Sequence, residues 1–552
     1  MTDSATFANG AESAESATGS AKRPRVVMLV ANSVAGDSRV QKIAWSMAAT
    51  GWDVTLLGRA PADSTSPKSG EPIRYRLGAA NVVLVPVPKT ISGYEAARLR
   101  GGKRAAKLRP AYRHARAELA ARDAAGRDVA ARRRRSVANA VIRGWLAARP
   151  GADAIVARCG RGPVGGAARR LLGGVLGLTD KYGGWRWFNP WFADLELALA
   201  PAVRDLNPDL IHAHDFHMVG VGARLAATLS TPGHRVSWIY DAHEYLRGIE
   251  VPASTDVRLR MRRRMLIGVE REYIGRADAV VTVSEGIAAR IAEDHTLAQR
   301  PRVILNAPVI SADNGAATGP GRTLRDDCEL GPDVPLLLYS GGMSPRRGVR
   351  TAIEALVRLR DAHLVLIARE DDPDIPALRR TAAEHEVTDR LHVLPYVPVD
   401  QVVRYISSAS IGLIPILHLP NHELSLITKY FEYLHAALPI VTSDVREMAA
   451  ETRRLGVGEV FTAGDAASLA SAVETVLADQ GRYRAVYQGE DDPRVASSWA
   501  GQAARLDALY RELLHTVPGS SRNQGELQLI RIDETLSPDA RSLSSMANGT
   551  SR

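Results

Sequence analysis

The sequence predicts an α/β protein built from two doubly wound parallel sheets in series. Short β-branched runs alternate with amphipathic segments of helical spacing, which is typical of βαβ units. The alternation occurs twice, and a Gly, Ala and Asp-rich stretch at 311–333 separates the two halves. The chain has 552 residues, which is too long for one ordinary core and sufficient for two. The expected ligand site is the cleft between the two domains.

In the first half, predicted strands at 25–33 and 52–58 flank a helix at 37–51, and this order implies a parallel sheet. The same rhythm returns over 209–308, so we expect a first domain at 25–305. The second half restarts with the strand PLLLYSGG and continues through the strand PIVTSD and a helix at 465–479, which gives a second domain at 306–496. A final amphipathic helix follows at 497–516.

Composition excludes several classes of protein. Hydrophobic residues make up 45% of the chain and charged residues 24%, which is ordinary for a soluble globular protein. Two cysteines, Cys159 and Cys328, are too few for a disulfide framework or a cysteine-rich metal site, and they suit a reducing compartment. Neither a membrane-spanning run nor a signal peptide is expected, so we predict a cytoplasmic chain with disordered tails at 1–24 and 517–552.

The net charge of +10 is concentrated in one segment. Arg98–Arg149 holds 16 Lys or Arg residues and three acidic residues, and it lies in an Ala and Arg-rich helical insertion predicted at about 95–190. Val137, Val141 and Trp145 give its later part an apolar stripe. One interpretation is a basic amphipathic helix that binds an anionic membrane, on its inner face, or an acidic polymer. The other is a solvated helical insertion.

The stretch YSGGMSPRRG is the most informative for chemistry. A predicted strand ends in Gly341 and Gly342, and a helix is expected to begin near Arg347–Gly348. Glycines allow the backbone to approach an anion, and a helix start offers free N–H groups. Arg346 and Arg347 add fixed charge, so this stretch predicts a diphosphate site. The alternative is a basic helix start on the surface.

A second candidate lies in TKYFEYLHAAL, a predicted helix. Glu432 lies among aromatic and apolar neighbours, and a ribose diol is a suitable partner for its carboxylate. The alternative is an ion pair with Lys429, three residues earlier.

Two predicted strands end in histidine and acidic residues, in HAHDFH and YDAHEY. His214 with Asp215, and His243 with Glu244, would lie where parallel sheets place their ligands. Satisfied structural histidines are the alternative. We predict no metal site here, because His212 and His214 share a strand face while His217 lies in the next turn.

Two further patterns receive no functional role. Gly160, Gly162 and Gly165 spell a dinucleotide fingerprint, but inside the irregular insertion. Asp372-Pro-Asp374 spells an acidic metal-binding triplet, but in a loop of the second domain.

In their order, these segments resemble the family 4 glycosyltransferases of the GT-B fold over about Arg25 to Leu514, the insertion excepted. The resemblance implies that SGGMSPRRG is the Gly-Arg-x4-Lys-Gly segment of that family, with Arg347 at the Lys position and Gly342 at the Arg position. Glu432 matches the second glutamate of Glu-x7-Glu, and Leu424 stands where the first would be. The final helix resembles the one that crosses back to the first domain.

The resemblance also implies a role for each site residue. His243, Arg347 and Lys429 would be catalytic. The predicted donor contacts are Gly36, Gly341, Gly342, Arg346, Val393, Tyr396, Ile427, Thr428 and Glu432. The predicted acceptor-side residues are Asp37, Arg39, His214, Asp215 and Glu244.

The expected activity is transfer of a sugar from a nucleotide diphosphate donor to a cell-envelope or small-molecule acceptor, with retention and without a metal or other cofactor. Expected partners are the nucleotide sugar and a carbohydrate or lipid-linked acceptor, and no nucleic acid. Two alternatives stay open: a GT-B scaffold that binds a nucleotide sugar without turnover, and a nucleotide-sugar epimerase.

Overall fold

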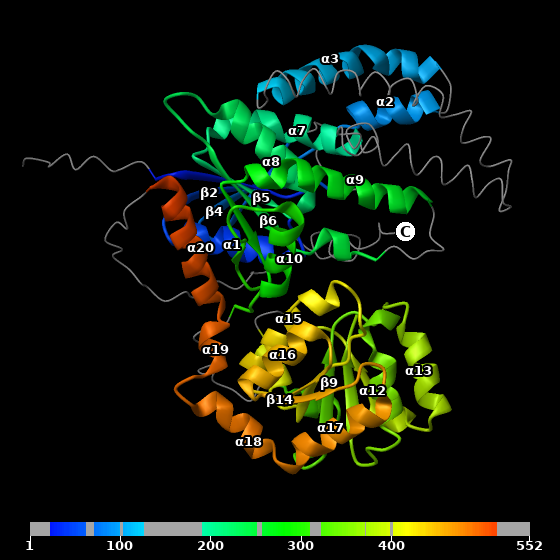
Figure 1. The fold of residues 1–552 in the computed structure, drawn as a ribbon. Helices are drawn as coiled ribbons and strands as arrows, with labels where there is room; N and C mark the ends of the chain where they lie inside the picture. The colour runs from blue at the N-terminus through cyan, green and yellow to red at the C-terminus, as the bar shows by residue number, and fades with distance from the viewer. Residues whose placement is uncertain are drawn as a thin grey trace, which may run out of the picture.

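The computed structural model contains two α/β domains, each built around its own sheet (Figure 1). The structure describes residues 23–61, 71–99, 103–125, 190–250, 257–309, 322–369, 371–397 and 401–515. Both predicted tails and most of the predicted insertion, including the apolar stripe at 137–145 and the glycine pattern at 160–165, lie outside the described residues.

The first sheet has eight strands in the order β3-β4-β2-β1-β5-β6-β7-β8. All neighbours are parallel except β3 and β4, which pair antiparallel at one edge. In the centre, Val27 of β1 pairs with Thr55 of β2 on one side and Ile211 of β5 on the other. The strands are β1 (Arg25–Leu29), β2 (Asp53–Arg59), β3 (Ile73–Leu77), β4 (Ala80–Val85), β5 (Leu210–His214), β6 (Ser237–Ala242), β7 (Ala279–Thr282) and β8 (Arg302–Val303).

Helices cover both faces of this sheet. The helix α1 follows β1, and a group of helices between β4 and β5 stacks above the opposite face in Figure 1. The helices of this domain are α1 (Ser38–Ala49), α2 (Thr90–Leu99), α3 (Lys103–Ala125), α7 (Pro190–Leu206), α8 (Asp215–Leu229), α9 (Val257–Tyr273) and α10 (Glu285–His295).

The second sheet has six parallel strands in the order β11-β10-β9-β12-β13-β14. They are β9 (Leu336–Ser340), β10 (His363–Ile367), β11 (Leu391–Leu394), β12 (Ile411–Ile414), β13 (Ile440–Ser443) and β14 (Gly458–Phe461). The helices around them are α11 (Leu324–Asp327), α12 (Val349–Ala355), α13 (Ile375–Glu384), α14 (Val402–Ile406), α15 (Thr428–His435), α16 (Arg446–Leu455), α17 (Ala466–Ala478), α18 (Gln480–Ala485) and α19 (Pro493–Ala496).

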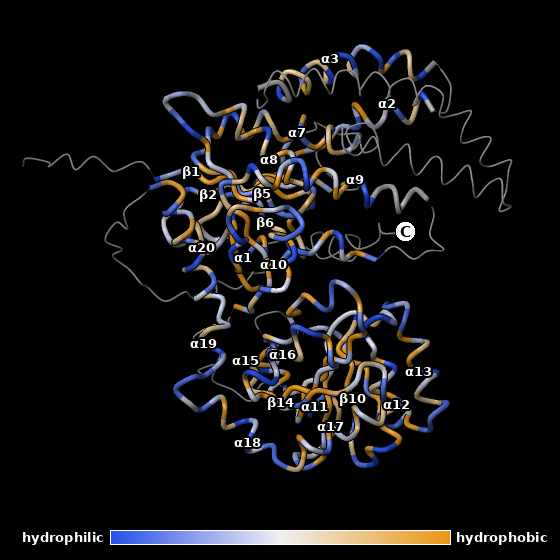
Figure 2. Tube along the Cα trace, viewed as in Figure 1, coloured by the Kyte–Doolittle hydropathy of each residue, from blue (hydrophilic) through white to orange (hydrophobic). Residues whose placement is uncertain are grey.

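Each sheet forms the centre of a hydrophobic core. Figure 2 shows apolar residues concentrated on the strands and on the inner sides of the helices, with polar residues outside. The strands read as continuous apolar runs because parallel sheets are buried on both faces. In β9, for example, all five residues are buried.

The last helix, α20 (Trp499–Leu514), packs on the first domain although it follows the second in sequence. Its Trp499 Nε1 donates to Ser46 Oγ at 2.8 Å, and Trp52 Nε1 donates to Asp507 Oδ1 at 2.7 Å. Leu506 and Tyr510 are fully buried against the same face as α1. The chain therefore crosses between the domains once after β8 and again before α20.

The predicted fold class, with two doubly wound sheets, is confirmed. The antiparallel edge pair β3–β4 was not predicted, because Ile73–Leu77 carries two arginines and is only half-buried. No helix within the described ranges combines the length and the hydropathy needed to cross a bilayer.

Candidate functional site

The glycine-rich loop after β9 is shaped by close backbone approaches. Gly341 has a φ of +138°, and Gly348 has a φ of +67° with Pro415 O only 1.8 Å from where a Cβ would stand. The helix predicted to begin near Arg347–Gly348 is present: α12 begins at Val349 with Gly348 as its N-cap, and a 3₁₀ turn at Pro345–Arg347 precedes it. The left-handed conformation of Gly348 separates the two, and only glycine fits there.

Two arginines project from this turn with their charges uncompensated. Arg346 is exposed and Arg347 is half-buried, and among the described residues neither has a carboxylate within ion-pair distance. The Arg346 carbonyl accepts from Leu417 N at 3.1 Å, which fixes the turn against the loop after β12. The turn therefore offers fixed positive charge beside a flexible glycine pair, as an anion site requires.

Lys429 and Glu432 lie opposite this loop, on the first turns of α15. Lys429 Nζ lies 3.1 Å from Glu432 Oε2, so the ion pair forms that the sequence allowed as an alternative. A Cβ on Gly341 would lie 3.6 Å from Lys429 Cε, so the lysine stem crosses the glycine loop. No side chain caps the N-terminus of α15 at Ile427–Thr428. The fold thus places Lys429, the positive N-terminal end of α15 and the Glu432 carboxylate close together.

Tyr396 and Val393 lie at the end of β11, near the same loop. The Tyr396 side chain is 48% exposed, an unusual exposure for a large aromatic residue in this chain. Burial of the rest of the ring raises the pKa of Tyr396, and the charges of Asp372 and Glu432 act in the same direction. Tyr396 therefore lies within electrostatic reach of Glu432, and about half of the residue is open to solvent.

Glu423, one residue from the position of the family's first glutamate, has a different function. Its carboxylate accepts from Arg446 N at 2.9 Å and contacts His418 Nδ1 at 2.5 Å, so it caps the start of α16. Leu424 is buried, and its carbonyl accepts from Ser284 Oγ of the first domain at 2.5 Å. The loop thus binds the first domain instead of presenting a second carboxylate.

In the first domain, Asp241 at the end of β6 collects several donors. Arg39 donates to both its carboxylate oxygens, from Nε at 3.0 Å and Nη2 at 2.9 Å. His214 Nδ1 lies 3.1 Å from Asp241 Oδ2, and His243 Nε2 lies 3.3 Å from the same oxygen. Burial alone would raise the pKa of Asp241, but Arg39 and His243 hold it well below its usual range. Asp241 is therefore a carboxylate at the centre of the cluster.

His243 is the member of this cluster nearest to solvent, with a side chain 21% exposed. Burial would lower its pKa, but the adjacent Asp241 outweighs that effect, so the pKa of His243 is raised. Its Nε2 faces Asp241, which leaves Nδ1 for a ligand. His214 and Arg39 were predicted on the acceptor side, but both are buried. They bind Asp241 and thereby hold the carboxylate that His243 contacts.

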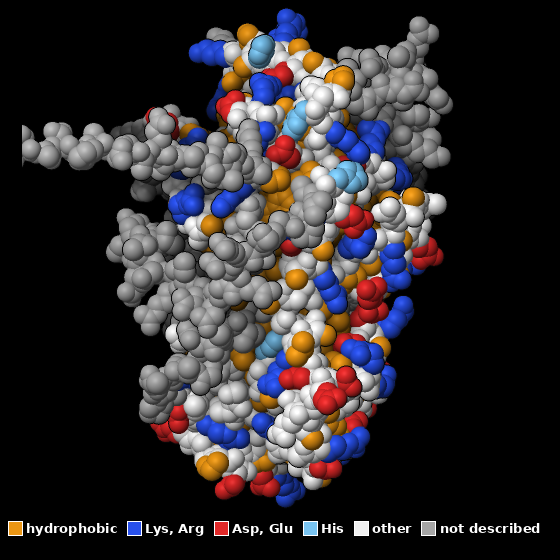
Figure 3. Space-filling model, turned by 90° about the vertical axis from the view of Figure 1, so that its left-hand side faces the viewer, with side chains coloured by type: hydrophobic (Ala, Val, Ile, Leu, Met, Phe, Trp, Pro, Cys, Tyr) orange, Lys and Arg blue, Asp and Glu red, His pale blue; other side chains and the backbone are white. Residues whose placement is uncertain are grey.

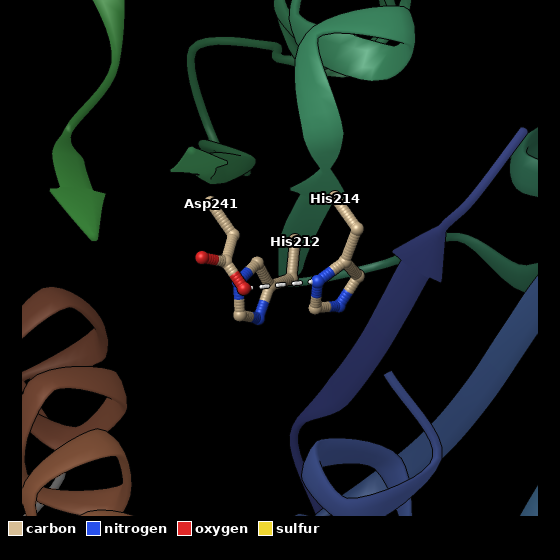
Figure 4. Close-up of side chains that lie close together, drawn as sticks. All are labelled: His212, His214 and Asp241. Atoms are coloured by element: carbon tan, nitrogen blue, oxygen red, sulfur yellow. Dashed lines mark hydrogen bonds and ion pairs between the residues drawn. The ribbon is translucent and has the colours of Figure 1, made fainter. Parts of the chain in front are cut away.

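His212, His214 and Asp241 each place a ligand atom within 4.8 Å of the others (Figure 4). His212 Nδ1 contacts Tyr510 OH at 2.6 Å, and burial lowers the pKa of His212 well below its usual range. A divalent cation would have to lie beside the Arg39 guanidinium, which already binds both oxygens of Asp241. The donor set therefore fits a hydrogen-bond network better than a metal site.

Asp215 and Glu244 follow this cluster at the strand ends. Asp215 has a φ of +66°, a strained conformation for a non-glycine residue, and its Oδ2 lies 3.0 Å from His217 Nδ1. Glu244 has no hydrogen-bond or ion-pair partner among the described residues. Burial raises the pKa of Glu244 to about 7, and the nearby Asp215 contributes.

Aromatic rings beside these carboxylates were not predicted. The Trp191 ring lies 5.7 Å from the His217 ring, and the Phe216 ring lies 4.0 Å from it. Trp191 lies on α7, which precedes β5, so only the folded chain brings it to Asp215. The run FNPW at 188–191 was the available sequence signal, because aromatic residues make up only 5% of the chain.

Gly36 and Asp37 shape the loop between β1 and α1. Gly36 has a φ of +80° and open space around it. Asp37 caps α1 by accepting from Val40 N at 3.3 Å, and it also accepts from Asn32 Nδ2 at 2.8 Å. The predicted acceptor-side residue Asp37 therefore first serves to hold this loop.

Both halves of the chain match known protein families. Residues 145–307 match the model described as Glycosyltransferase Family 4, and residues 334–479 match Glycosyl transferases group 1. A 2-deoxystreptamine glucosyltransferase from Streptomyces kanamyceticus is 24% identical over 331 residues, which cover 59% of this chain and 80% of the relative.

Solved structures of glycosyltransferases share the fold. A sucrose-phosphate synthase from Thermosynechococcus elongatus has a TM-score of 0.57 and 15% identity, covering 90% of this chain and 100% of that chain. A trehalose-6-phosphate structure from E. coli, bound with UDP-2-fluoro glucose, has a TM-score of 0.53 and 13% identity, with the same coverage. With both domains matched in order on this fold, the chain belongs to the GT-B glycosyltransferases, with a family 4 first domain and a group 1 second domain.

Proposed function

We propose that this protein transfers glucose from UDP-glucose to a polyhydroxylated ring. The observation that carries the proposal is the pair of uncompensated arginines, Arg346 and Arg347, beside the glycine loop and opposite Lys429 and Glu432. The relative from S. kanamyceticus is named a glucosyltransferase, and the related E. coli structure contains UDP-2-fluoro glucose, which supports this choice of donor.

The donor would bind with its diphosphate on the arginine turn and the N-terminus of α15. Glu432 would bind the ribose hydroxyls, and this requires Lys429 to leave its present partner for the diphosphate. Tyr396 would lie against the base with its exposed ring. Donor binding would therefore replace the Lys429–Glu432 ion pair by a contact of Lys429 with the diphosphate and a contact of Glu432 with the ribose.

The reaction breaks the bond between the anomeric carbon and the phosphate oxygen, and forms a bond to an acceptor hydroxyl oxygen. The leaving diphosphate gains negative charge, which Arg347 and the released Lys429 would stabilise. His243, whose Nε2 faces Asp241, would donate to the donor sugar from Nδ1. The hydroxyl proton passes to the leaving phosphate on the same face of the sugar, which gives retention.

The acceptor would lie on the first domain, between the carboxylates and the aromatic rings. The half-buried Trp191 and Phe216 would supply apolar contacts to a saturated ring, and Asp215 and Glu244 would accept hydrogen bonds from hydroxyl or amino groups. Such a surface suits a sugar or a cyclitol. The acceptor named in the relative, 2-deoxystreptamine, is of this kind.

The proposal is tested with the purified full-length chain, UDP-glucose and a panel of sugar and cyclitol acceptors, with products identified by mass spectrometry. Arg347→Ala should lower turnover about 10²-fold or more, as the loss of a fixed transition-state donor does. Arg350→Ala is the matched control, because Arg350 is exposed and paired with Glu354 on α12. Equal turnover by Arg347→Ala and wild type would contradict the site.

The same assay separates the alternatives. A binding scaffold would retain UDP-glucose without consuming it under any condition of the panel. An epimerase would convert the donor without any acceptor present. Sugar transfer to an acceptor excludes both.

We also propose that the exposed face of α3 binds an anionic surface. Arg104, Lys107, Arg109 and Arg113 are all exposed on this helix, and they lie within the basic segment of the sequence. Over the second domain, by contrast, Lys and Arg alternate with Asp and Glu on the face shown in Figure 3. Clustered positive charge on one exposed helix attracts anionic lipid headgroups.

A further inference from the structure

Lys42 is a half-buried lysine at the junction of the two domains. Its Nζ, on α1, donates to Asn306 Oδ1 at 2.9 Å and to Ala307 O at 2.5 Å, and lies 4.7 Å from the centroid of the Trp499 ring. Asn306 and Ala307 belong to the segment that leaves β8, and Trp499 begins α20. Lys42 therefore contacts both places where the chain crosses between the domains.

The surroundings of Lys42 do not compensate its charge with a carboxylate. Among the described residues its direct partners are an amide, a carbonyl and an aromatic ring, and no ion pair forms. Burial lowers the pKa of Lys42 to about 7; Arg39 acts in the same direction, while Glu432 and Asp37 oppose it. A partly desolvated cation without a carboxylate partner contributes little to stability, so a stabilising role explains Lys42 poorly.

Asn306 extends the contact of Lys42 into the second domain. Its Nδ2 donates to Thr428 Oγ1 at 3.2 Å. Thr428 is the first residue of α15, the helix that carries Lys429 and Glu432 and whose N-terminus has no side-chain cap. A chain of two hydrogen bonds thus runs from Lys42 through Asn306 to the donor side of the site.

Arg39 binds the same segment one helical turn earlier. Its Nη1 donates to Ile304 O at 2.8 Å, while its other nitrogens bind Asp241. α1 therefore contacts the interdomain segment through two side chains. Arg39 also binds Asp241, which contacts His243. Lys42 binds Asn306, which contacts the first residue of α15.

We propose that Lys42 is a positioning residue for donor binding, which holds the N-terminus of α15 in place through Asn306 and Thr428. The inference rests on the proposed function, because that function assigns α15 to the donor. It adds that the first domain sets the geometry of a site in the second. Donor affinity then depends on a residue that does not touch the donor.

The test is a double-mutant cycle on the full chain, with UDP-glucose affinity measured by calorimetry. Lys42→Met keeps the side-chain length but removes all three donors, and we expect it to weaken UDP-glucose binding about tenfold. Thr428→Val should weaken binding to a similar extent. Both substitutions interrupt the same series of hydrogen bonds. The double variant should therefore bind UDP-glucose about as well as the single variant with the lower affinity. Lys89→Met, at an exposed lysine, is the matched control.

A pH series gives a second readout that a merely structural role would not produce. Wild-type affinity for UDP-glucose should fall as the pH rises through 7, because the neutral amine donates weaker hydrogen bonds to Asn306 and Ala307 than the ammonium does. Arg39, Asp37 and Glu432 are the charged neighbours of Lys42. Lys42→Met should lack the part of the transition that belongs to Lys42. His243 and Glu244 remain in both proteins, so the readout is the difference between the two pH profiles. Identical profiles would overturn the proposal.

The possible failures are distinguishable. Wild-type protein that binds no UDP-glucose contradicts the proposed function. Wild-type protein that binds it, with losses in the two single variants that simply add, contradicts the role of Lys42 alone. If Lys42→Met does not fold, the same cycle is measured between Asn306→Ala and Thr428→Val, and additivity there has the same meaning.

Discussion

Arg39 and Asp241 form a two-point ion pair that is almost completely removed from solvent. The side chains are 4% and 0% exposed, and they come from α1 and β6, far apart in the sequence. Asp241 also contacts His214 and His243, so this pair joins the first helix of the chain to the proposed catalytic histidine.

Removing one member of this pair should be strongly destabilising. Arg39→Met leaves the Asp241 carboxylate buried without its main partner, and we expect a loss of about 3–5 kcal/mol in the free energy of unfolding. Urea denaturation at pH 7 measures it. The control is Arg290→Met, which removes an exposed, solvent-screened pair with Glu293 and should change the free energy of unfolding far less. If Arg39→Met lowers the free energy of unfolding no more than the control does, the buried Asp241 carboxylate is not stabilised by Arg39.

The pH dependence of stability should reveal Glu244. Its pKa is raised in the folded chain from 4.5 to about 7, so between these values the folded state holds a proton that the unfolded state has released. The contribution of Glu244 to stability is therefore fully present below pH 4.5 and is lost as the pH rises through 7. Glu244→Gln removes this loss.

The comparison is the melting temperature of Glu244→Gln and wild type at pH 5 and pH 8. We expect the difference between the two proteins to shift in favour of the variant at pH 8. Glu293→Gln, at an exposed glutamate, should show no such shift. A difference for Glu244→Gln that is the same at both pH values would place the carboxyl group in a more polar environment than the structure gives it.

The basic face of α3 predicts binding to anionic vesicles that is sensitive to salt. Replacement of Arg104, Lys107 and Arg109 by Gln should abolish most of the binding to vesicles with phosphatidylserine, because each basic residue near such a surface contributes about 1 kcal/mol. Co-sedimentation at low and high salt measures this. Binding by wild type that ignores salt, or equal binding by the variant, would contradict an electrostatic contact.

Much of the fold could be predicted because the strands of both sheets are short and strongly apolar. The run LLLYS in β9 and the alternation of strand and helix leave little ambiguity in a parallel sheet. Strand β3 was missed because it lies at the edge, where Arg74 and Arg76 face solvent and the apolar signal weakens. Local pattern is informative only where burial is complete.

The candidate site was less predictable, since its contacts join distant parts of the chain. Lys429 and Glu432 are three residues apart on one helix, so their pairing was foreseeable. Nothing local connects Arg39 to Asp241, or Lys42 to Asn306. Those contacts depend on how α1 lies across the sheet, which is a property of packing.

The position of α20 has a consequence for synthesis on the ribosome. Trp499, Leu506 and Tyr510 complete the apolar layer beneath α1, yet they are translated after all of the second domain. The apolar face of the first domain therefore stays exposed to solvent until the second domain and α20 have left the ribosome. A chain truncated before residue 497 would lack α20, so the first domain could not complete its hydrophobic core. The C-terminal helix therefore decides whether the N-terminal domain can finish folding.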